Sequence, residues 1–286
     1  MADSQAAPDA NVLVVRNLRI EATVRPPGEK PHDILIVDNV SLTLQKGRVL
    51  GLIGESGAGK STIGLSALGY GRGGVRITGG EVFLNGRDIL KGGASGLRAL
   101  RGKEVSYVAQ SAAAAFNPSH RLMGQVVESA MHHGVANRAQ AEQRAVALFK
   151  KLGLPDPENF GQRFPHQVSG GQLQRAMTAM ALCAEPDLIV FDEPTTALDV
   201  TVQKEVLKLM NELVAQERSS LIFVSHDLPV VSAMTETIAV MRNGKVVEHT
   251  TVSELFHNPL HEYSRKLIDT ARATEAEFKR FAIGTN

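Results

Sequence analysis

The chain has strand-like hydrophobic patterns at both ends and a long stretch of helical pattern between them. Apolar and polar residues alternate over residues 11–24 and 34–44, as expected for half-buried strands. Residues 48–54 form an apolar run bounded by glycines, which is typical of a strand buried on both faces. A helix is predicted directly after it, from residue 60. Short strands are predicted over residues 80–86 and 104–110, around a small helix near residues 97–100.

The pattern changes to helices between residues 111 and 184. Residues 124–133 and 138–153 are predicted helices, and in the second the apolar residues Ala145, Leu148, Phe149 and Leu152 follow the spacing of one helix face. From residue 187 strands and helices alternate again. Strands are predicted over residues 187–193, 220–226, 237–241 and 245–249, and helices over residues 202–217, 228–234 and 252–281. This order predicts an α/β fold with a parallel sheet, interrupted by a helical segment.

Composition narrows the class of protein. The chain has 286 residues, a net charge of +1 and 43% hydrophobic residues, which is typical of a globular protein of one or two domains. A net charge this close to zero does not indicate a basic surface of the kind that binds nucleic acids. Cys183 is the single cysteine, which excludes an internal disulfide, and we expect it to be a buried apolar residue. No apolar run approaches the roughly 18 residues of a membrane-spanning helix, so we expect a cytosolic chain.

The strongest chemical signal lies among the glycines, of which 17 of 26 fall between Gly47 and Gly102. The segment Gly54-Glu55-Ser56-Gly57-Ala58-Gly59-Lys60-Ser61 matches the pattern G-x-x-x-x-G-K-[ST], between a predicted strand and a predicted helix. Glycines let backbone N–H groups approach phosphates closely, Lys60 adds a positive charge, and the Ser61 hydroxyl is a ligand for Mg²⁺. This segment, extended to Thr62, therefore predicts a nucleotide-phosphate site.

A second signal is the segment LIVFDE, residues 188–193, a predicted strand that ends in two carboxylates. Asp192 and Glu193 stand at its carboxyl end, where open α/β sheets bind ligands. We expect Asp192 to hold Mg²⁺, directly or through water, and Glu193 to polarise the attacking water. The alternative is that this strand simply ends in a charged turn. The predicted phosphate site around Lys60 makes that alternative less favoured, because a nucleotide site needs carboxylates of this kind.

A third signal is the segment VSGGQ, residues 168–172, before a helix predicted from residue 173 to 183. A serine and two glycines at the start of a helix form a second anion-accepting helix end. Taken alone, such a segment is usually only a helix cap. The chain is thus predicted to carry two helix N-termini that can accept phosphate.

Taken in order, the glycine segment at 54–61, VSGGQ at 168–172 and VFDEP at 190–194 resemble the nucleotide-binding subunits of ATP-binding cassette (ABC) transporters, over residues 12–268. The family's other marks match Gln110 (Q-loop), Asp199 in the triplet 197–199 (D-loop) and His226 (switch histidine). The resemblance implies a P-loop NTPase cassette over residues 11–268, with a mixed sheet core (11–110 and 185–250) that includes an antiparallel part. It also implies an inserted helical subdomain at about 111–184 and a C-terminal helical extension at 251–286, after a flexible tail at 1–10.

The same resemblance implies roles for these residues. ATP and Mg²⁺ would be the ligands, with Gln110 joining Ser61 and Asp192 at the metal, Glu193 as general base, and His226 at the γ-phosphate. Two cassettes stack head to tail in this family. Ser169, Gly170, Gly171 and Gln172 would therefore act on ATP held by a second ATP-binding subunit, identical or paralogous, and a monomer would hydrolyse ATP poorly.

The resemblance also implies partners and a location. Two transmembrane permease subunits would dock on the helical subdomain and Gln110, with a solute-binding protein acting through them. The chain would then lie at the cytoplasmic face of a bacterial inner membrane.

Finer sequence marks point to a subfamily. GESGAGKS, AFNPSHRL, TTALDVTVQ and ELFHNPLHEYSRKL resemble the dipeptide, oligopeptide and nickel importer ATPases, which implies solute uptake. Peptides are the first candidate solute, with nickel, opines and oligosaccharides as alternatives. Ala22 stands near the position where many of these ATPases stack an aromatic residue on adenine. An ABC-type ATPase of DNA repair is the alternative function, although the coiled-coil heptads and cysteine pairs typical of that class do not occur in the sequence.

Overall fold

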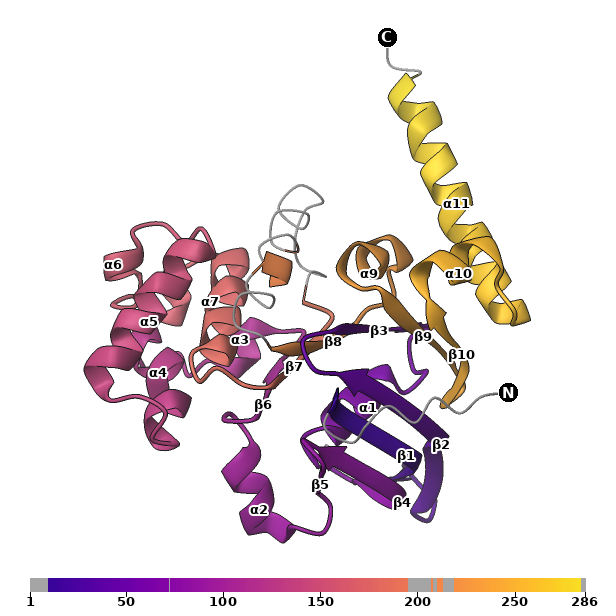
Figure 1. Cartoon of the computed structure of the whole chain (residues 1–286), viewed down its shortest axis with the longest axis horizontal. Coiled ribbons are helices and arrows are strands. Elements are labelled where there is room, and N and C mark those ends of the chain that lie inside the picture. Colours follow the sequence, from indigo (N-terminus) through magenta and orange to yellow (C-terminus); the bar gives the residue numbers. More distant parts are fainter. Residues whose placement is uncertain (1–9, 72, 195–206, 208–209, 213–218, 284–286) are drawn as a thin grey trace.

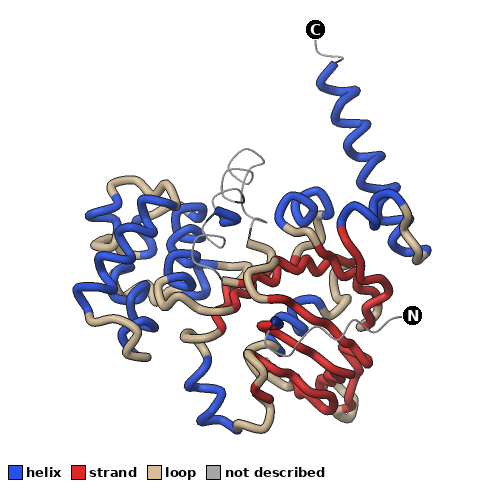
Figure 2. The backbone as a smooth tube through the Cα atoms, in the orientation of Figure 1, coloured by secondary structure: helices blue, strands red, loops and turns tan. Residues whose placement is uncertain are grey.

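Two β-sheets and a layer of helices form the body of the protein (Figures 1 and 2). The computed structural model describes residues 10–71, 73–194, 207, 210–212 and 219–283. In Figure 1 the helical layer lies at the left, the antiparallel sheet at the lower right, and the C-terminal helix projects from the body at the upper right. The predicted tail (except residue 10), the Asp199 segment and most of the helix predicted over 202–217 lie outside the described residues.

The antiparallel sheet is built from the two alternating segments predicted near the N-terminus. Its strand order is β2-β1-β4-β5. The strands are β1 (Asn11–Val24), β2 (His32–Gln45), β4 (Val75–Leu84) and β5 (Arg87–Asp88), and helix α2 (Gly93–Leu100) follows them. In β1 the buried residues include Leu13, Val15, Leu18 and Ile20, so one face of the sheet packs on the core.

The central sheet carries the carboxyl-terminal strand ends that form the site. Its order is β10-β9-β3-β8-β7-β6, and every neighbouring pair is parallel except β9 and β10. The strands are β3 (Val49–Gly54), β6 (Val105–Val108), β7 (Leu188–Asp192), β8 (Ser220–Val224), β9 (Thr237–Arg242) and β10 (Lys245–Thr251). The antiparallel pairing of β9 with β10 agrees with the mixed sheet that the resemblance implied. Asn243 and Gly244 both have positive φ (49° and 75°), which makes the two-residue turn of an antiparallel hairpin.

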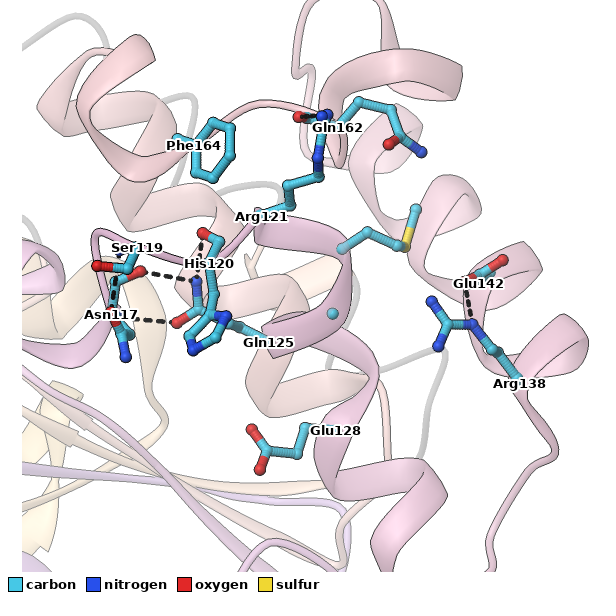
Figure 3. A pocket seen from close by; sticks show the side chains of 12 residues that line it. Asn117, Ser119, His120, Arg121, Gln125, Glu128, Arg138, Glu142, Gln162 and Phe164 are labelled. Carbon is cyan, nitrogen blue, oxygen red and sulfur yellow. Dashed lines mark hydrogen bonds and ion pairs between the residues drawn. The ribbon is translucent and has the colours of Figure 1, made fainter.

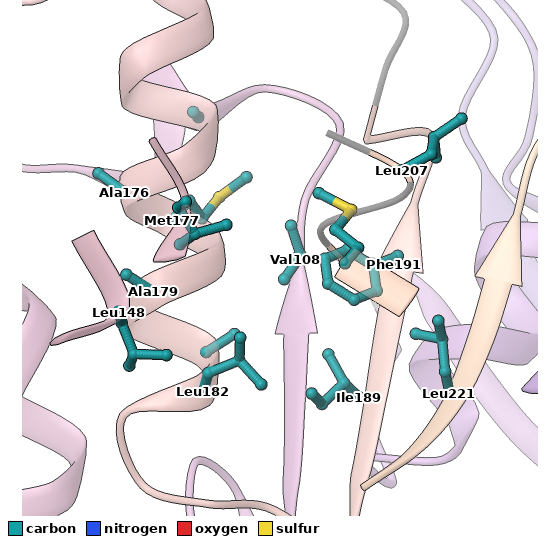
Figure 4. Packing of buried hydrophobic residues seen from close by; sticks show 14 of the residues in the cluster. Val108, Leu148, Ala176, Met177, Ala179, Leu182, Ile189, Phe191, Leu207 and Leu221 are labelled. Carbon is teal, nitrogen blue, oxygen red and sulfur yellow. The ribbon is translucent and has the colours of Figure 1, made fainter. Parts of the chain in front are cut away.

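The central strands are buried on both faces, as their apolar runs predicted. Ile189 and Phe191 of β7 pack into a cluster shared with the helical layer, whereas Leu188 and Val190 pack into the cluster beneath the antiparallel sheet. Figure 4 shows the first of these clusters, in which Val108 lies between Met177 and Phe191. Because side chains on both faces of these strands are packed in this way, only the strand ends are accessible to ligands.

Helices cover both faces of the central sheet. Helix α1 (Lys60–Ser66) contacts β3, β7 and β8 and also β2. The layer on the other side contains α3 (Ala112–Ala115), α4 (Leu122–His132), α5 (Arg138–Lys151), α6 (Pro157–Phe160), the short 3₁₀ helix η2 (Pro165–Gln167) and α7 (Gly170–Leu182). The remaining helices are α9 (Leu228–Met234), α10 (Val252–His257) and α11 (Glu262–Ile283).

Helix α7 begins three residues before its predicted start. Ser169 is the N-cap, and its hydroxyl accepts a hydrogen bond from the Gln172 N–H, while the Gln172 side chain accepts from the Ser169 N–H. This capping box brings Gly170 and Gly171 into the first helical turn. Cys183, at the end of the helix, is fully buried as predicted, and burial raises the pKa of its thiol to about 11. Within the described part of the chain, no helix combines the length and apolar character needed to cross a membrane.

Candidate functional site

The phosphate-binding segment, Gln110, Glu193 and His226 converge on one open pocket of about 670 Å³ at the carboxyl ends of the central strands. It receives residues from the loop after β3, from the segment after β6, and from the ends of β7 and β8. The lining residues are Ile36, Ser56, Gly57, Ala58, Gly59, Lys60, Ser61, Thr62, Gln110, Glu193 and His226. With Ile36 of β2, the structure therefore brings together residues from five parts of the chain, as expected for ligand binding at the strand ends of an α/β sheet.

The loop at residues 54–59 has a backbone path that requires glycine. Gly54 has a φ of 151°, and a Cβ at this position would lie 2.2 Å from the carbonyl oxygen of Met241. Gly57 has a φ of 82° with open space around it, so its conformation and not its packing favours glycine. The first glycine thus allows close packing against β9, and the second allows the left-handed backbone conformation within the loop.

Lys60 places a positive charge at the centre of this loop. Its ammonium group is largely buried and donates to the carbonyl oxygens of Gly54 (2.8 Å) and Glu55 (2.9 Å). Burial lowers the pKa of Lys60, while the nearby carboxylates of Glu193, Asp192 and Glu55 act in the opposite direction. The loop therefore holds the ammonium group against carbonyl oxygens and within the field of three acids.

Asp192 and Ser61 form the second part of the site. The Ser61 hydroxyl donates to Asp192 Oδ1 at 2.7 Å, and the Tyr107 hydroxyl donates to Asp192 Oδ2. The Asp192 side chain is buried, so both of its oxygens have partners where water is scarce. Gln110, two residues after β6, lines the same pocket. A hydroxyl, a carboxylate and an amide oxygen are ligand types that Mg²⁺ accepts, so these three residues fit that ion.

Tyr107 is a contact of this site that the sequence analysis missed. It lies on β6 opposite Val190 of the parallel strand β7, two residues before Asp192. A tyrosine in a short strand that begins and ends with valine was not a strong signal, but its hydroxyl needs a partner once the strand is largely buried. Which residue that partner would be depends on the pairing of β6 with β7.

Glu193 and His226 form the third part of the site. Glu193 has a φ of 50°, in the left-handed region that residues other than glycine seldom adopt, and its N–H donates to the Val224 carbonyl of the neighbouring strand. Its carboxylate lies 2.9 Å from His226 Nδ1. The Glu193 side chain is 16% exposed and the His226 side chain 59%. Backbone strain of this kind is concentrated at functional sites, because the surrounding structure must hold it.

The segment of Ser169, Gly170, Gly171 and Gln172 lies on the helical layer, and none of these four is among the residues that line the pocket. Figure 1 shows α7 in the left-hand layer, separate from α1. Ser169 and Gly170 are exposed, and a Cβ at Gly170 would meet nothing within 4 Å. The packing of the chain itself therefore does not require a glycine at position 170. Asp199 lies outside the described residues.

A second open pocket, of about 800 Å³, lies on the helical layer (Figure 3). It is formed by the segment before α4, by α4 itself, by the start of α5 and by residues that follow α6. Its lining residues are Asn117, Ser119, His120, Arg121, Met123, Gly124, Gln125, Glu128, Arg138, Glu142, Gln162 and Phe164. Gln125 holds the segment before α4 in place, since its side chain bonds to the backbone of Asn117 and His120. Most of the lining side chains are polar or charged.

Comparison with known proteins places this geometry in a family. The family model described as ABC transporter matches residues 37–196. The chain belongs to this family. It is 36% identical over 273 residues to the dipeptide transport ATP-binding protein DppD of Lactococcus lactis subsp. cremoris, covering 95% of this chain and 77% of the relative. It is 38% identical over 238 residues to the oligopeptide transport ATP-binding protein OppD of the same subspecies, covering 83% of this chain and 70% of the relative.

A solved structure supports the same assignment. The ABC transporter chain superposes with a TM-score of 0.72 on a dimeric ATP-binding cassette, MJ0796, in a post-hydrolysis state bound to ADP and Pi. The two are 25% identical, and the match covers 84% of this chain and 98% of the other. The family, the cassette fold and the ATPase activity predicted from sequence are therefore confirmed, and ATP is the ligand of the cassette.

Proposed function

We propose that this ATPase energises the uptake of peptides through a membrane permease at the cytoplasmic face of a bacterial inner membrane. The relatives named above are dipeptide and oligopeptide transport proteins, and the chain spans at least 70% of each. The observation that carries the catalytic part is the convergence of Lys60, Ser61 and the Glu193–His226 pair in one pocket, with Asp192 hydrogen-bonded to Ser61. Nickel, opines and oligosaccharides are the competing solutes.

The phosphate-binding part follows from the loop geometry. The N–H groups of residues 57–62 and the Lys60 ammonium group bind the β- and γ-phosphates, supported by the glycine-dependent path of the loop. Ser61, Asp192 and Gln110 hold Mg²⁺, which when bound neutralises phosphate charge. Tyr107 keeps the Asp192 carboxylate oriented through its hydrogen bond.

The hydrolytic part rests on Glu193. Its carboxylate accepts a proton from the attacking water, and its left-handed backbone conformation turns it away from the strand and into the pocket. With the proton on Nδ1, His226 donates a hydrogen bond to the Glu193 carboxylate and orients it. The largely exposed ring of His226 is then available to contact the γ-phosphate, as the resemblance implied.

We further propose that the working site needs a second ATP-binding subunit. Ser169, Gly170, Gly171 and Gln172 would meet the γ-phosphate held by the partner cassette, because Ser169 and Gly170 at the helix start are exposed and the packing of Gly170 does not require a glycine. Asp199 would lie between the two cassettes, a role that rests on its sequence match alone. The solved dimer of the related cassette MJ0796 is consistent with such a pairing.

The helical layer is proposed to dock the permease subunits. The polar pocket of Figure 3 starts seven residues after Gln110, so the segment that lines the ATP pocket leads directly into it. This supports the division into a core (residues 11–110 and 185–250), a helical subdomain (about 111–184) and a C-terminal extension (251–286). A solute-binding protein would act on the permease and not on this chain.

Replacement of Glu193 by glutamine tests the proposal. In the assembled transporter we expect Glu193→Gln to retain ATP binding and to lose about 10²- to 10⁴-fold in phosphate release, the usual range for a general base. Glu81→Gln, at an exposed acid of β4 paired with Arg16, is the matched control and should behave like the wild type. Unchanged turnover in Glu193→Gln would refute the assignment of Glu193 as the general base.

The solute class is tested with the assembled transporter and its solute-binding protein. Stimulation of ATP hydrolysis by nickel but not by di- and oligopeptides would refute peptides as the solute.

A further inference from the structure

The C-terminal extension reaches back to the phosphate-binding loop at one point. The backbone N–H of Glu55 donates to the hydroxyl of Tyr263, in the first turn of α11, at 2.9 Å. The two residues are 208 positions apart in the chain. The pocket described above does not include Tyr263, so this tyrosine supports the loop from outside.

The bond acts on a single peptide unit. The peptide that joins Gly54 to Glu55 carries the N–H bonded to Tyr263, and its carbonyl oxygen accepts the bond from Lys60 Nζ at 2.8 Å. In a planar trans peptide the N–H and C=O groups point in opposite directions, so the two bonds hold one plane from both sides. Gly54 is conformationally permissive, and with a φ of 151° it restrains this plane weakly by itself.

The tyrosine is itself held rigidly. The Arg242 guanidinium lies over its ring, 5.0 Å from the centroid, and the Tyr263 N–H donates to His261 Nδ1. Glu248, a buried residue of β10, accepts hydrogen bonds from the N–H groups of Leu260 and His261 at 3.0 Å each. Burial also raises the pKa of the Tyr263 hydroxyl, which stays protonated and neutral at physiological pH. The position of the Tyr263 hydroxyl is therefore fixed by contacts with strands β9 and β10.

We propose that Tyr263 is a positioning residue for ATP binding. Its hydroxyl fixes the peptide between Gly54 and Glu55, and through that peptide the carbonyl that orients Lys60. The C-terminal extension therefore sets the affinity of the loop for nucleotide phosphates. This inference rests on the proposed role of Lys60 and the loop in binding ATP.

The test uses the full chain with Tyr263→Phe, which keeps the ring and its contact with Arg242 and removes only the hydroxyl. We expect the Kd for ATP and the KM of the assembled transporter to rise about 3- to 10-fold, as for loss of one net hydrogen bond. The kcat at saturating ATP and the Tm without nucleotide should stay within twofold and about 1 °C of the wild type. Tyr70→Phe, at an exposed tyrosine outside the pocket, is the matched control and should leave all four quantities unchanged.

The outcomes separate the two proposals. If the wild-type chain does not bind ATP in calorimetric titration, the proposed function fails. If the wild type binds ATP and Tyr263→Phe binds it with the same Kd, the positioning role of Tyr263 is refuted. It is also refuted if the variant loses kcat and thermal stability together while the KM is unchanged, since that result means a structural role only.

Discussion

Replacing Gly170 by alanine separates the stability of helix α7 from its proposed contact with a partner's nucleotide. Within the chain the added methyl group meets nothing within 4 Å, and the φ of Gly170 is not in the left-handed region. Alanine favours helix and restricts the unfolded chain more than glycine, so the free energy of unfolding should stay constant or rise by up to about 1 kcal/mol. For a chain of this size that corresponds to a Tm increase of no more than about 3 °C.

The same methyl group should damage catalysis. In the proposed dimer it stands between the first-turn N–H groups of α7 and the γ-phosphate of the partner's ATP. Loss of one hydrogen bond to a charged group costs about 1.5–3 kcal/mol, which lowers ATP hydrolysis about 10- to 100-fold. ATP binding to the isolated chain should not change, because Gly170 does not line the pocket.

Thermal unfolding and phosphate release by the assembled transporter measure the two effects. Gly96→Ala is the matched control, since Gly96 lies within helix α2 with the same open space and no contact with the pocket. It should show a similar change in Tm and wild-type turnover. Wild-type turnover in Gly170→Ala would show that this helix start is only a cap, and the proposed action on a partner's nucleotide would be wrong.

Three further predictions follow from particular contacts. Gly54→Ala, whose Cβ would lie 2.2 Å from the Met241 carbonyl oxygen, should destabilise the chain by more than about 3 kcal/mol in urea unfolding, and a loss under 1 kcal/mol would contradict the close packing. Glu248→Gln should cost about 1–3 kcal/mol at pH 7. Burial opposes ionisation of Glu248, but hydrogen bonds from the N–H groups of Leu260 and His261 hold its pKa below the ordinary 4.5. Its contribution to stability is therefore full above pH 4.5 and is lost as the pH falls through the folded-state pKa. An equal difference between wild type and variant at pH 7 and pH 4 would refute this cause. Cys183, buried and with a pKa of about 11, should react with a thiol reagent at pH 8 more than about 100-fold slower in the native chain than in denaturant, and rapid native labelling would contradict its burial.

Much of the site could be predicted because its parts are local in the chain. A phosphate-binding loop needs one strand, one turn and one helix in succession, and residues 49–66 supply all three. Asp192 and Glu193 follow an apolar run whose length and position determine that they stand at a strand end. The hairpin of β10 also has a local signal, because the pair Asn243-Gly244 favours the two-residue turn of an antiparallel hairpin.

Other features of the site depend on residues that are far apart in the chain. Tyr107 meets Asp192 across 85 positions, and Tyr263 meets Glu55 across 208. The periodicity of a strand or helix shows which face is buried, but a polar side chain on that face finds its partner only when the strand order and register are known.

The sequence by itself determined the cassette family, the phosphate-binding loop and the carboxylates at the strand end, because each depends on the order of neighbouring residues. The tertiary structure decided how Asp192 is held, how Glu193 and His226 pair, and that the C-terminal extension supports the loop through Tyr263. The physical reason is that a hydrogen bond depends on angstrom-scale distance and direction, and folding alone brings distant segments to that precision.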